Sequence, residues 1–167
     1  MASKTLVPVE EYLKMSFDGP EPDYVDGELK ERYLGSIPHF EATERLIDLF
    51  RSWKQSHSLY AYTEVTLRLS PTKYRIADVA VFRGRPKGKY PSEPTAFAIE
   101  VVSEDDRWLD IQTKLYEYHQ WGVTHVWLVD PWTRKLHVCD NTGLHEVVAL
   151  EAPEFGIKFS AGDIFVD

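Results

Sequence analysis

The sequence predicts a single α/β (α+β) domain in which helices flank a mixed central sheet and a β-hairpin is added at each end. The main observation is the order of its segments: a helix, three strands, a second helix and another strand. A meander followed by a crossover helix into a further strand produces a sheet with antiparallel and parallel neighbours. The second observation is that 167 residues with 43% hydrophobic content match one compact domain. No repeat or low-complexity tract divides the chain, so we expect one domain over residues 1–167.

The N-terminal part predicts a short helix, a hairpin and a longer helix. Residues 8–15 read as an amphipathic helix, with a proline near the start and Gly19-Pro20 beyond the end. Asp26-Gly27 between alternating residues is a strong hairpin signal. Over residues 41–53 the apolar residues recur at steps of three and four, which indicates one buried face of a helix.

Three strands are predicted next, over residues 61–69, 75–82 and 95–102. The first alternates between apolar and polar residues, as a strand with one buried face does. The second and third are almost continuously apolar, which is typical of central strands covered on both faces.

The C-terminal part predicts a helix, a buried strand and a hairpin. Residues 107–121 carry an apolar stripe and end before Gly122, a suitable C-terminal cap. We expect the acidic residues 104–106 to cap the start of this helix, where its dipole favours negative charge. A buried strand follows over 125–130, and segments 135–139 and 145–150 are expected to pair as a hairpin.

Several classes of protein are excluded by composition. The one cysteine, Cys139, excludes internal disulfides and Cys-clustered zinc sites, and it fits a reducing cytoplasm. No apolar run exceeds four residues, whereas a membrane span needs about 20 and a signal peptide about 7 to 15. We therefore expect a soluble, cytoplasmic protein with no membrane partner.

Charge is distributed unevenly along the chain. The net charge of −8 argues against a protein that coats nucleic acid. Residues 68–89, however, hold seven basic residues and one acid, so this segment carries +6 and the remainder −14. Such asymmetry can steer an anionic partner to one face, although a solvated loop between strands has the same pattern. The candidate phosphate-binding residues are Arg83, Arg85, Lys87 and Lys89.

Two carboxylates interrupt strands that otherwise favour complete burial. Asp78 lies within Ile-Ala-Asp-Val-Ala-Val-Phe, and Glu100 lies within Ala-Phe-Ala-Ile-Glu-Val-Val. A buried carboxylate must be neutralised, paired with a cation or bound to a metal. On neighbouring strands the two would suit Mg²⁺ or Mn²⁺, which takes one or two protein carboxylates and otherwise binds water and phosphate oxygens. The alternative is that each pairs with a structural Arg or Lys.

Other catalytic motifs are missing from the sequence. No segment follows the phosphate-loop or dinucleotide glycine patterns, and His145-Glu146 has no second histidine four residues after the first. These absences argue against a P-loop ATPase, a dinucleotide enzyme and an H-E-x-x-H zinc protease.

Five short motifs occur in a particular order. They are Tyr24-Val-Asp-Gly27-Glu28-Leu followed by His39, Arg75-Ile-Ala-Asp78-Val-Ala-Val, Ile99-Glu100-Val-Val-Ser103, Asp110-x-x-x-Lys114-x-x-x-Tyr118, and Gly122-Val-Thr-His-Val-Trp-Leu-Val-Asp130-Pro131. In this combination they resemble the Uma family of putative restriction endonucleases, within the PD-(D/E)XK nuclease superfamily. The resemblance covers most of the chain, and it implies a restriction-endonuclease-like core with the order of elements predicted above.

The resemblance also implies site residues. It makes Asp78 and Glu100 metal carboxylates and suggests the backbone carbonyl of Val101 as a further ligand. The sequence departs from the superfamily pattern at Ala77, where a proline is usual, and at Val102, where the motif has lysine.

Three further residues match the family's own pattern. Lys114 is the nearest substitute for the missing lysine, although it could instead form an exposed pair with Asp110. Glu28 and His39 match upstream positions of the family, and their alternatives are a solvated strand residue and packing at the start of a helix.

Together these observations predict an Mg²⁺- or Mn²⁺-dependent endonuclease that hydrolyses DNA phosphodiester bonds. Asp78 and Glu100 would hold the metal, Lys114 would stabilise charge on the phosphate, and the basic segment would position the DNA backbone. The rival is a catalytically inactive nuclease-fold module that binds nucleic acid or protein, favoured by Val102 and the net charge and opposed by the retained carboxylates. Exposed members of the 22 aromatic residues could form a homodimer in either case.

Overall fold

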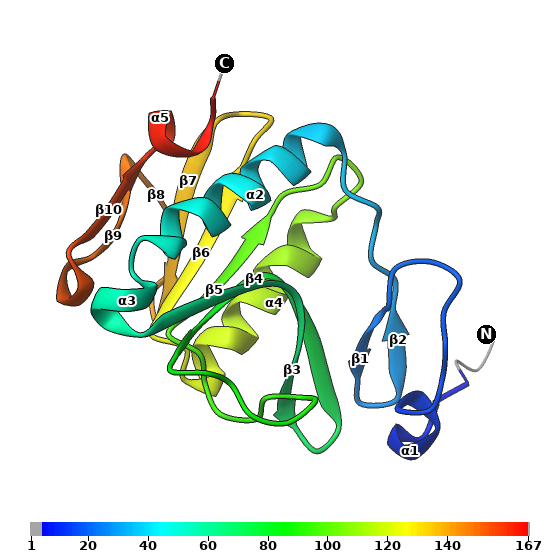
Figure 1. Cartoon of the computed structure of the whole chain (residues 1–167). Helices are drawn as coiled ribbons and strands as arrows, with labels where there is room; N and C mark the ends of the chain where they lie inside the picture. The colour runs from blue at the N-terminus through cyan, green and yellow to red at the C-terminus, as the bar shows by residue number, and fades with distance from the viewer. Residues whose placement is uncertain (1–4, 167) are drawn as a thin grey trace.

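The computed structural model describes residues 5–166 and has one large mixed sheet with helices on both faces (Figure 1). The sheet has the order β2-β1-β4-β5-β6-β7-β8, and β3 also pairs with β4. Its strands are β1 (Asp23–Val25), β2 (Glu28–Lys30), β3 (Leu59–Ser70), β4 (Lys73–Arg83), β5 (Phe97–Val101), β6 (His125–Asp130), β7 (Lys135–Asp140) and β8 (Gly143–Val147). A second sheet pairs β9 (Ala149–Ala152) with β10 (Ile157–Ser160), joined through the 3-10 turn η1 (Pro153–Phe155).

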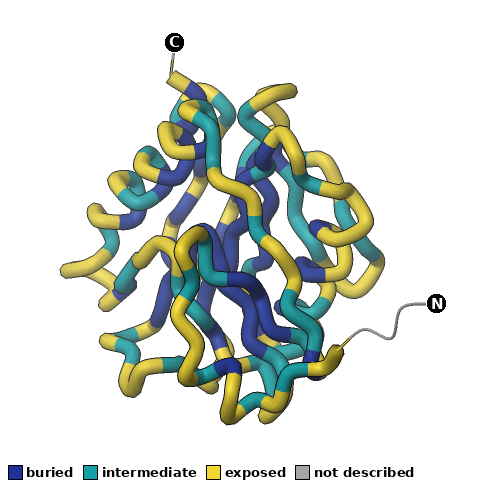
Figure 2. Tube along the Cα trace, turned by 90° about the vertical axis from the view of Figure 1, so that its right-hand side faces the viewer, coloured by how far each residue is buried: buried dark blue, intermediate teal, exposed yellow. Residues whose placement is uncertain are grey.

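The helices are α1 (Val9–Tyr12), α2 (Ile37–Arg51), α3 (Lys54–His57), α4 (Trp108–Trp121) and α5 (Ala161–Ile164). Helix α2 packs Leu46 and Phe50 on one face of the central strands, against Trp127 and Phe159. Helix α4 packs on the opposite face, together with Ala80 and Ala98 of β4 and β5. The centre of the sheet is therefore buried on both sides, as Figure 2 shows along the tube.

The predicted mixed sheet, flanked by helices and extended by hairpins, is confirmed. The predicted core order appears as α2, β3, β4, β5, α4 and β6, with the short α3 added. At the Asp26-Gly27 turn both residues have positive φ, 50° and 92°, which joins β1 to β2. Gly122 ends α4 with φ of 107°, as expected of a glycine C-cap.

Apart from element ends that differ by up to three residues, the predicted elements were wrong at three places. Helix α2 begins at Ile37 rather than residue 41, because Pro38 is well suited to the first turn of a helix. The predicted strand 145–150 is split between the two sheets at Val148, which is 94% exposed. Residues 104–106 do not cap α4: in the described chain its N-cap is Arg107 without a side-chain bond, and Asp106 accepts the backbone N–H of Ser103 instead.

The sheet opens between β4 and β5. These strands pair antiparallel only as far as Val79 and Ile99. The first residues of β4 pair with β1 instead, and β5 pairs with β6 in parallel on its other side. Asp78 and Glu100 each lie one residue beyond the last pair. The divergence gives their side chains room that a continuous sheet would not. None of the helices within residues 5–166 is long and apolar enough to cross a membrane.

Candidate active site

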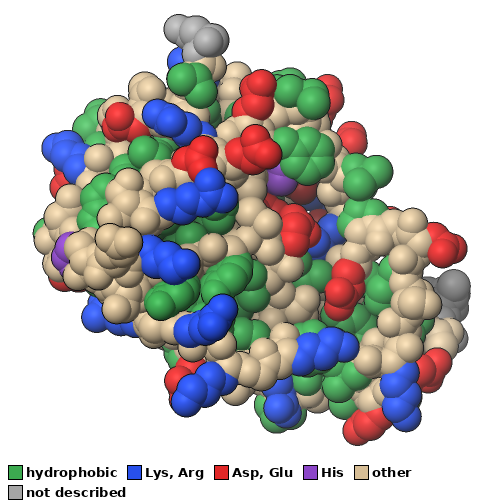
Figure 3. Space-filling view, viewed as in Figure 1, with side chains coloured by type: hydrophobic (Ala, Val, Ile, Leu, Met, Phe, Trp, Pro, Cys, Tyr) green, Lys and Arg blue, Asp and Glu red, His purple; other side chains and the backbone are tan. Residues whose placement is uncertain are grey.

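A cleft of about 970 Å³ lies where β4 and β5 diverge. Its walls include both predicted metal carboxylates, the segment between β2 and α2, the start of α2, and one side of α4. Figure 3 shows the hollow between the β1–β2 hairpin and the body of the molecule, with acidic side chains and a histidine on its walls. Asp78 and Glu100 are 6% and 7% exposed, so the site combines an open mouth with a desolvated floor.

Asp78 is held by three groups from different parts of the chain. Its Oδ2 accepts the backbone N–H of Val101 at 2.8 Å and lies 3.4 Å from His39 Nε2. Its Oδ1 faces Arg32 Nη2 at 3.3 Å. Burial alone would favour the neutral acid, but contact with His39 and the nearby charges of Lys114 and Arg32 lower the pKa of Asp78 to about 2. Asp78 therefore carries its charge at neutral pH.

Glu100 has the opposite electrostatic character. Its Oε2 accepts a hydrogen bond from Lys114 Nζ at 2.9 Å, and its Oε1 accepts one from the Tyr118 hydroxyl at 2.9 Å. Burial, opposed by Lys114 and reinforced by the charge of Asp78, raises the pKa of Glu100 to about 8. The site thus contains one firmly ionised carboxylate beside one that readily holds a proton.

Lys114 reaches the floor of the cleft from helix α4. Besides Glu100, its ammonium donates to the Ile76 carbonyl at 2.6 Å and lies 3.6 Å from Asp23 Oδ2. Burial opposes its charge, but Asp23 and Glu100 raise the pKa of Lys114, which keeps it protonated. The alternative partner, Asp110, instead lies 3.9 Å from Arg107 on the exposed side of the helix.

Asp23 and its partners form a supporting network that sequence reasoning missed. The Oδ1 of Asp23 accepts the Ile76 N–H at 2.7 Å, and its Oδ2 pairs with Arg75 at 3.1 Å. Arg75 also donates to Glu117 at 2.6 Å. Because Lys114 contacts both Asp23 and the Ile76 carbonyl, the β1 hairpin and β4 jointly orient its amine toward Glu100.

Arg32 and His39 form the opposite wall. Arg32 bridges Asp78 and the Glu64 carboxylate, which lies 2.7 Å from its Nη1. His39 comes from the first turn of α2, and its Nδ1 is buried without a hydrogen-bond partner among the described residues. Gly35 allows this placement, since a Cβ there would lie 2.5 Å from Nδ1. Sequence reasoning identified His39 and missed Arg32.

The remaining candidates lie elsewhere. Glu28 is on β2, beside Lys30 at 2.6 Å, and is not among the described residues that line the cleft. The four basic residues after Phe82 are also not among the described residues that line the cleft. The first of them, Arg83, is five residues beyond Asp78, which is about 17 Å along an extended strand. Arg83 faces the second sheet, with its guanidinium 4.8 Å from the Phe155 ring and 3.8 Å from Glu154.

The donor set fits a hard divalent cation. Two carboxylates facing an open cleft match what Mg²⁺ takes from a protein. Within residues 5–166 no group of three or more His, Cys, Asp or Glu side chains is placed to hold a metal, so water and phosphate oxygens would complete the coordination. The Asp78 contacts with Arg32 and His39, at 3.3 Å and 3.4 Å, are longer than its 2.8 Å hydrogen bond from the Val101 N–H.

The raised pKa of Glu100 predicts a pH-dependent stability. Because the folded protein binds this proton more tightly than the unfolded chain does, the contribution is complete below the unfolded pKa, near 4.5, and is lost as pH rises through about 8. In EDTA, urea unfolding should therefore show the free energy of unfolding of wild type falling relative to Glu100→Gln between pH 5 and 9. Parallel curves for the two proteins would contradict the prediction.

Both the sequence and the fold of this chain are similar to those of known proteins. A model of the Uma2 family, described as "Putative restriction endonuclease", matches residues 9–160. The crystal structure of "a putative nuclease belonging to DUF820 from Anabaena variabilis ATCC 29413" superposes with a TM-score of 0.81 at 17% identity, over 95% of this chain and 98% of that one. At such identity the likeness shows the fold alone.

The fold also has a slight likeness to part of a much larger protein. A cryo-EM structure of a "DrdV-DNA complex" gives a TM-score of 0.39 at 17% identity, over 66% of this chain and 12% of that one, which is too slight a likeness to inform the site. Among curated proteins no sequence matches.

Proposed function

The chain belongs to the Uma2 family of putative restriction endonucleases, and from this membership and the geometry of the cleft we propose that it is an Mg²⁺- or Mn²⁺-dependent endonuclease acting on DNA. The observation that carries the proposal is the meeting of Asp78, Glu100 and Lys114 on the floor of one open cleft. Two carboxylates can hold a metal ion, and a cation beside them can stabilise the charge that develops on a phosphate during phosphodiester hydrolysis.

In the proposed site, Asp78, Glu100 and the carbonyl of Val101 would hold the metal. When bound, the metal would polarise the phosphate and lower the pKa of a water. Lys114 would stabilise negative charge developing on the phosphate, with Asp23 and Ile76 fixing the direction of its amine. Arg32 and His39, which contact the Asp78 carboxylate, would face the same phosphate from the opposite wall.

A non-catalytic module is the second candidate, and two observations favour it. Position 102 is Val, partly buried against the α4 face of the core, where the superfamily motif has lysine. Each oxygen of Asp78 and Glu100 also has a partner from the protein itself. A cluster whose charged groups are all paired within the protein is compatible with a purely structural role.

Plasmid nicking separates the two candidates. Supercoiled plasmid is incubated with pure protein in Mn²⁺ or in EDTA, with Asp78→Ala as the control for contaminating nuclease. We expect nicking by wild type in Mn²⁺ only. Equal nicking by both proteins, or no Mn²⁺-dependent cleavage of either the plasmid or a circular single strand, would refute the enzyme and leave the binding module.

We predict that the basic segment after β4 contacts the phosphates of bound DNA. Replacing Arg85, Lys87 and Lys89 together with Gln should weaken DNA binding similarly for all sequences. The slope of log affinity against log salt should become shallower by about 0.9 for each phosphate that these side chains no longer neutralise. Fluorescence anisotropy over a range of salt measures both quantities. Arg83→Gln is the matched control, because Arg83 faces Phe155 and Glu154 instead; unchanged affinity of the triple variant at low salt would indicate a merely solvated loop.

A further inference from the structure

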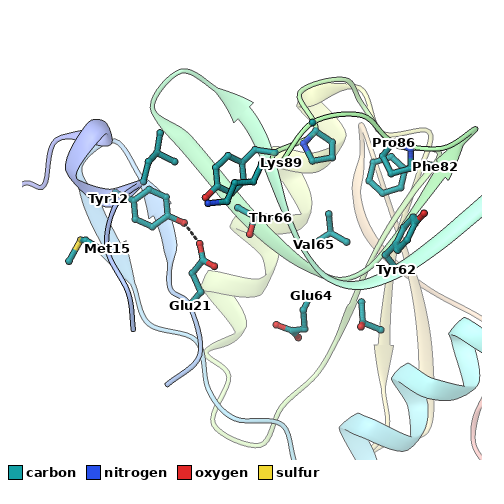
Figure 4. Close-up of a pocket in the computed structure, with 15 residues that line it drawn as sticks. Tyr12, Met15, Glu21, Tyr62, Glu64, Val65, Thr66, Phe82, Pro86 and Lys89 are labelled. Carbon is teal, nitrogen blue, oxygen red and sulfur yellow. Dashed lines mark hydrogen bonds between the residues drawn. The ribbon is translucent and has the colours of Figure 1, made fainter. Parts of the chain in front are cut away.

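A second hollow of about 470 Å³ adjoins the cleft. Its walls come from α1, β3, β4 and the segment 86–91, and Glu64 lines both hollows. In Figure 4, Tyr62, Phe82 and Pro86 lie together on one side, while Tyr12 and Glu21 lie across from them. The two hollows therefore meet at Glu64, which lies beside the site that holds Asp78.

Aromatic rings in this hollow are held in place by buried neighbours. Tyr62 is 37% exposed, and its ring contacts Phe82 edge-on at 6.0 Å between centroids. Tyr90 packs edge-on against buried Tyr74 at 5.5 Å. Rings fixed in this way lose little conformational freedom when a flat ligand stacks on them.

Positive charge adjoins the same hollow, because Lys89 lines it and Arg85 and Lys87 precede Lys89 in the same segment. The segment from Gly84 to Pro91 contains three basic residues and no acid. One of them, Lys89, places its ammonium 5.0 Å from the Tyr90 ring. The Pro91 carbonyl accepts the Arg68 N–H at 2.8 Å, which ties the segment to β3.

The two acids that line the hollow are already engaged. Glu21 accepts a hydrogen bond from the Tyr12 hydroxyl at 3.0 Å, and Glu64 is paired with Arg32 at 2.7 Å. The charge of Glu64 is therefore compensated by Arg32, and the one remaining acid, Glu21, is outnumbered by the three basic residues of the segment 84–91.

Aromatic faces beside phosphate-binding charge suit nucleotides whose bases are unpaired. Within a duplex the bases stack on one another and offer only their edges to a protein. Unpaired bases expose their faces and stack on aromatic side chains with little regard to sequence. We propose that Tyr62, Tyr90 and the basic segment form a subsite for unpaired bases of a DNA strand whose backbone continues into the catalytic cleft.

This inference rests on the proposed function and narrows its substrate class. The preferred substrate would be single-stranded DNA, or DNA with a flap or gap next to the scissile phosphate, rather than a uniform duplex. Recognition through stacking would tolerate any base at the subsite.

Binding is tested with a fluorescein-labelled 12-nucleotide single strand and the matching duplex, by anisotropy in EDTA at low salt. Loss of one stacked base should weaken binding about 5-fold or more. We therefore expect Tyr62→Ala to weaken single-strand binding at least that much and duplex binding less than twofold, and Tyr90→Ala to act in the same direction. Tyr62→Phe keeps the ring and should bind as wild type.

The matched control is Tyr116→Ala, since Tyr116 is 54% exposed on α4 and among the described residues lines neither hollow. Equal single-strand affinity of wild type and Tyr62→Ala, an equal loss for both DNA forms, or no binding by wild type would overturn the subsite. If wild type cleaves DNA in Mn²⁺ but Tyr62→Ala binds the single strand as wild type does, the subsite is refuted and the proposed function stands. If binding depends on Tyr62 but neither plasmid nor single-stranded DNA is cleaved in Mn²⁺, hydrolysis is refuted and the subsite stands.

Discussion

Replacing Asp78 with Asn is expected to lower Mn²⁺-dependent DNA cleavage at least about 100-fold, because a metal supplies several kcal/mol of transition-state stabilisation. The amide keeps the shape of the side chain and can still accept the Val101 N–H. It loses the full charge that His39, Lys114 and Arg32 hold at neutral pH. The substitution therefore removes a metal ligand while preserving most of the local geometry.

Isothermal titration of Mn²⁺ into wild type and Asp78→Asn measures the binding half of this prediction. Asp110→Asn is the matched control, because Asp110 lines the same cleft but is exposed and faces Arg107. Thermal unfolding of both variants checks that the protein remains folded, since Asn leaves the buried Arg32 and His39 with a weaker partner. Equal heats for wild type and Asp78→Asn would show that this carboxylate holds no metal.

The central fold could be predicted because its signals are local. The nearly continuous apolar runs of β4 and β5 and the apolar stripe of α4 each report burial directly. The last hairpin could not be resolved in the same way. Apolar residues continue past Val148, yet β8 belongs to the large sheet and β9 pairs with β10. Which sheet a strand joins depends on distant partners that no local pattern reveals.

The two carboxylates could be predicted for a related reason. Asp78 and Glu100 stand out against apolar strands, and burial of a carboxylate needs an explanation. The same reasoning applies to Arg75, a charge in the same buried strand, and would have predicted an acidic partner without naming Asp23 or Glu117. Partner identity depends on how the hairpin and α4 meet β4, which lies beyond local pattern.

Arg32 and Tyr118 were missed for different reasons. Arg32 lies in an irregular segment between β2 and α2, where no periodicity indicates direction. The sequence pattern places Tyr118 in the apolar stripe of α4, and its ring is indeed buried. A buried tyrosine hydroxyl needs a hydrogen-bond partner. Because Tyr118 follows Lys114 by one turn, that partner could have been sought among the carboxylates that Lys114 approaches.

The basic segment shows the limit of a charge pattern. A run of charge indicates an electrostatic preference but not the direction of each side chain. Arg83 ends β4 and faces Phe155, whereas Lys89 lines the hollow beside Tyr90. The run is therefore divided between two surfaces, and only part of it can act near the catalytic cleft.

Replacing Lys114 with Met should slow the chemical step of cleavage by about 100- to 1,000-fold, as expected when one charge-stabilising donor is removed. Lys114 is the cation nearest Glu100, and its amine is directed by Asp23 and the Ile76 carbonyl. Methionine retains the packing volume but cannot stabilise charge on the phosphate. Tyr118 still donates to Glu100, which can keep a proton when its cation is lost.

Single-turnover cleavage at saturating Mn²⁺ and DNA measures the chemical step apart from binding. Lys73→Met is the matched control, because Lys73 is also ion-paired, to Glu117 at 3.0 Å, but is not among the described residues that line the cleft. If Lys114 has only a structural role, Lys114→Met should be less stable, and its folded fraction should cleave at the wild-type rate.

If Lys114 stabilises charge, fully folded Lys114→Met should cleave more slowly. Its DNA affinity should stay within about twofold of wild type, because the interaction strengthens only in the transition state. Cleavage by Lys114→Met at the wild-type rate would therefore assign the lysine to folding, and charge stabilisation would have to come from Arg32 or His39, which face Asp78 across the cleft.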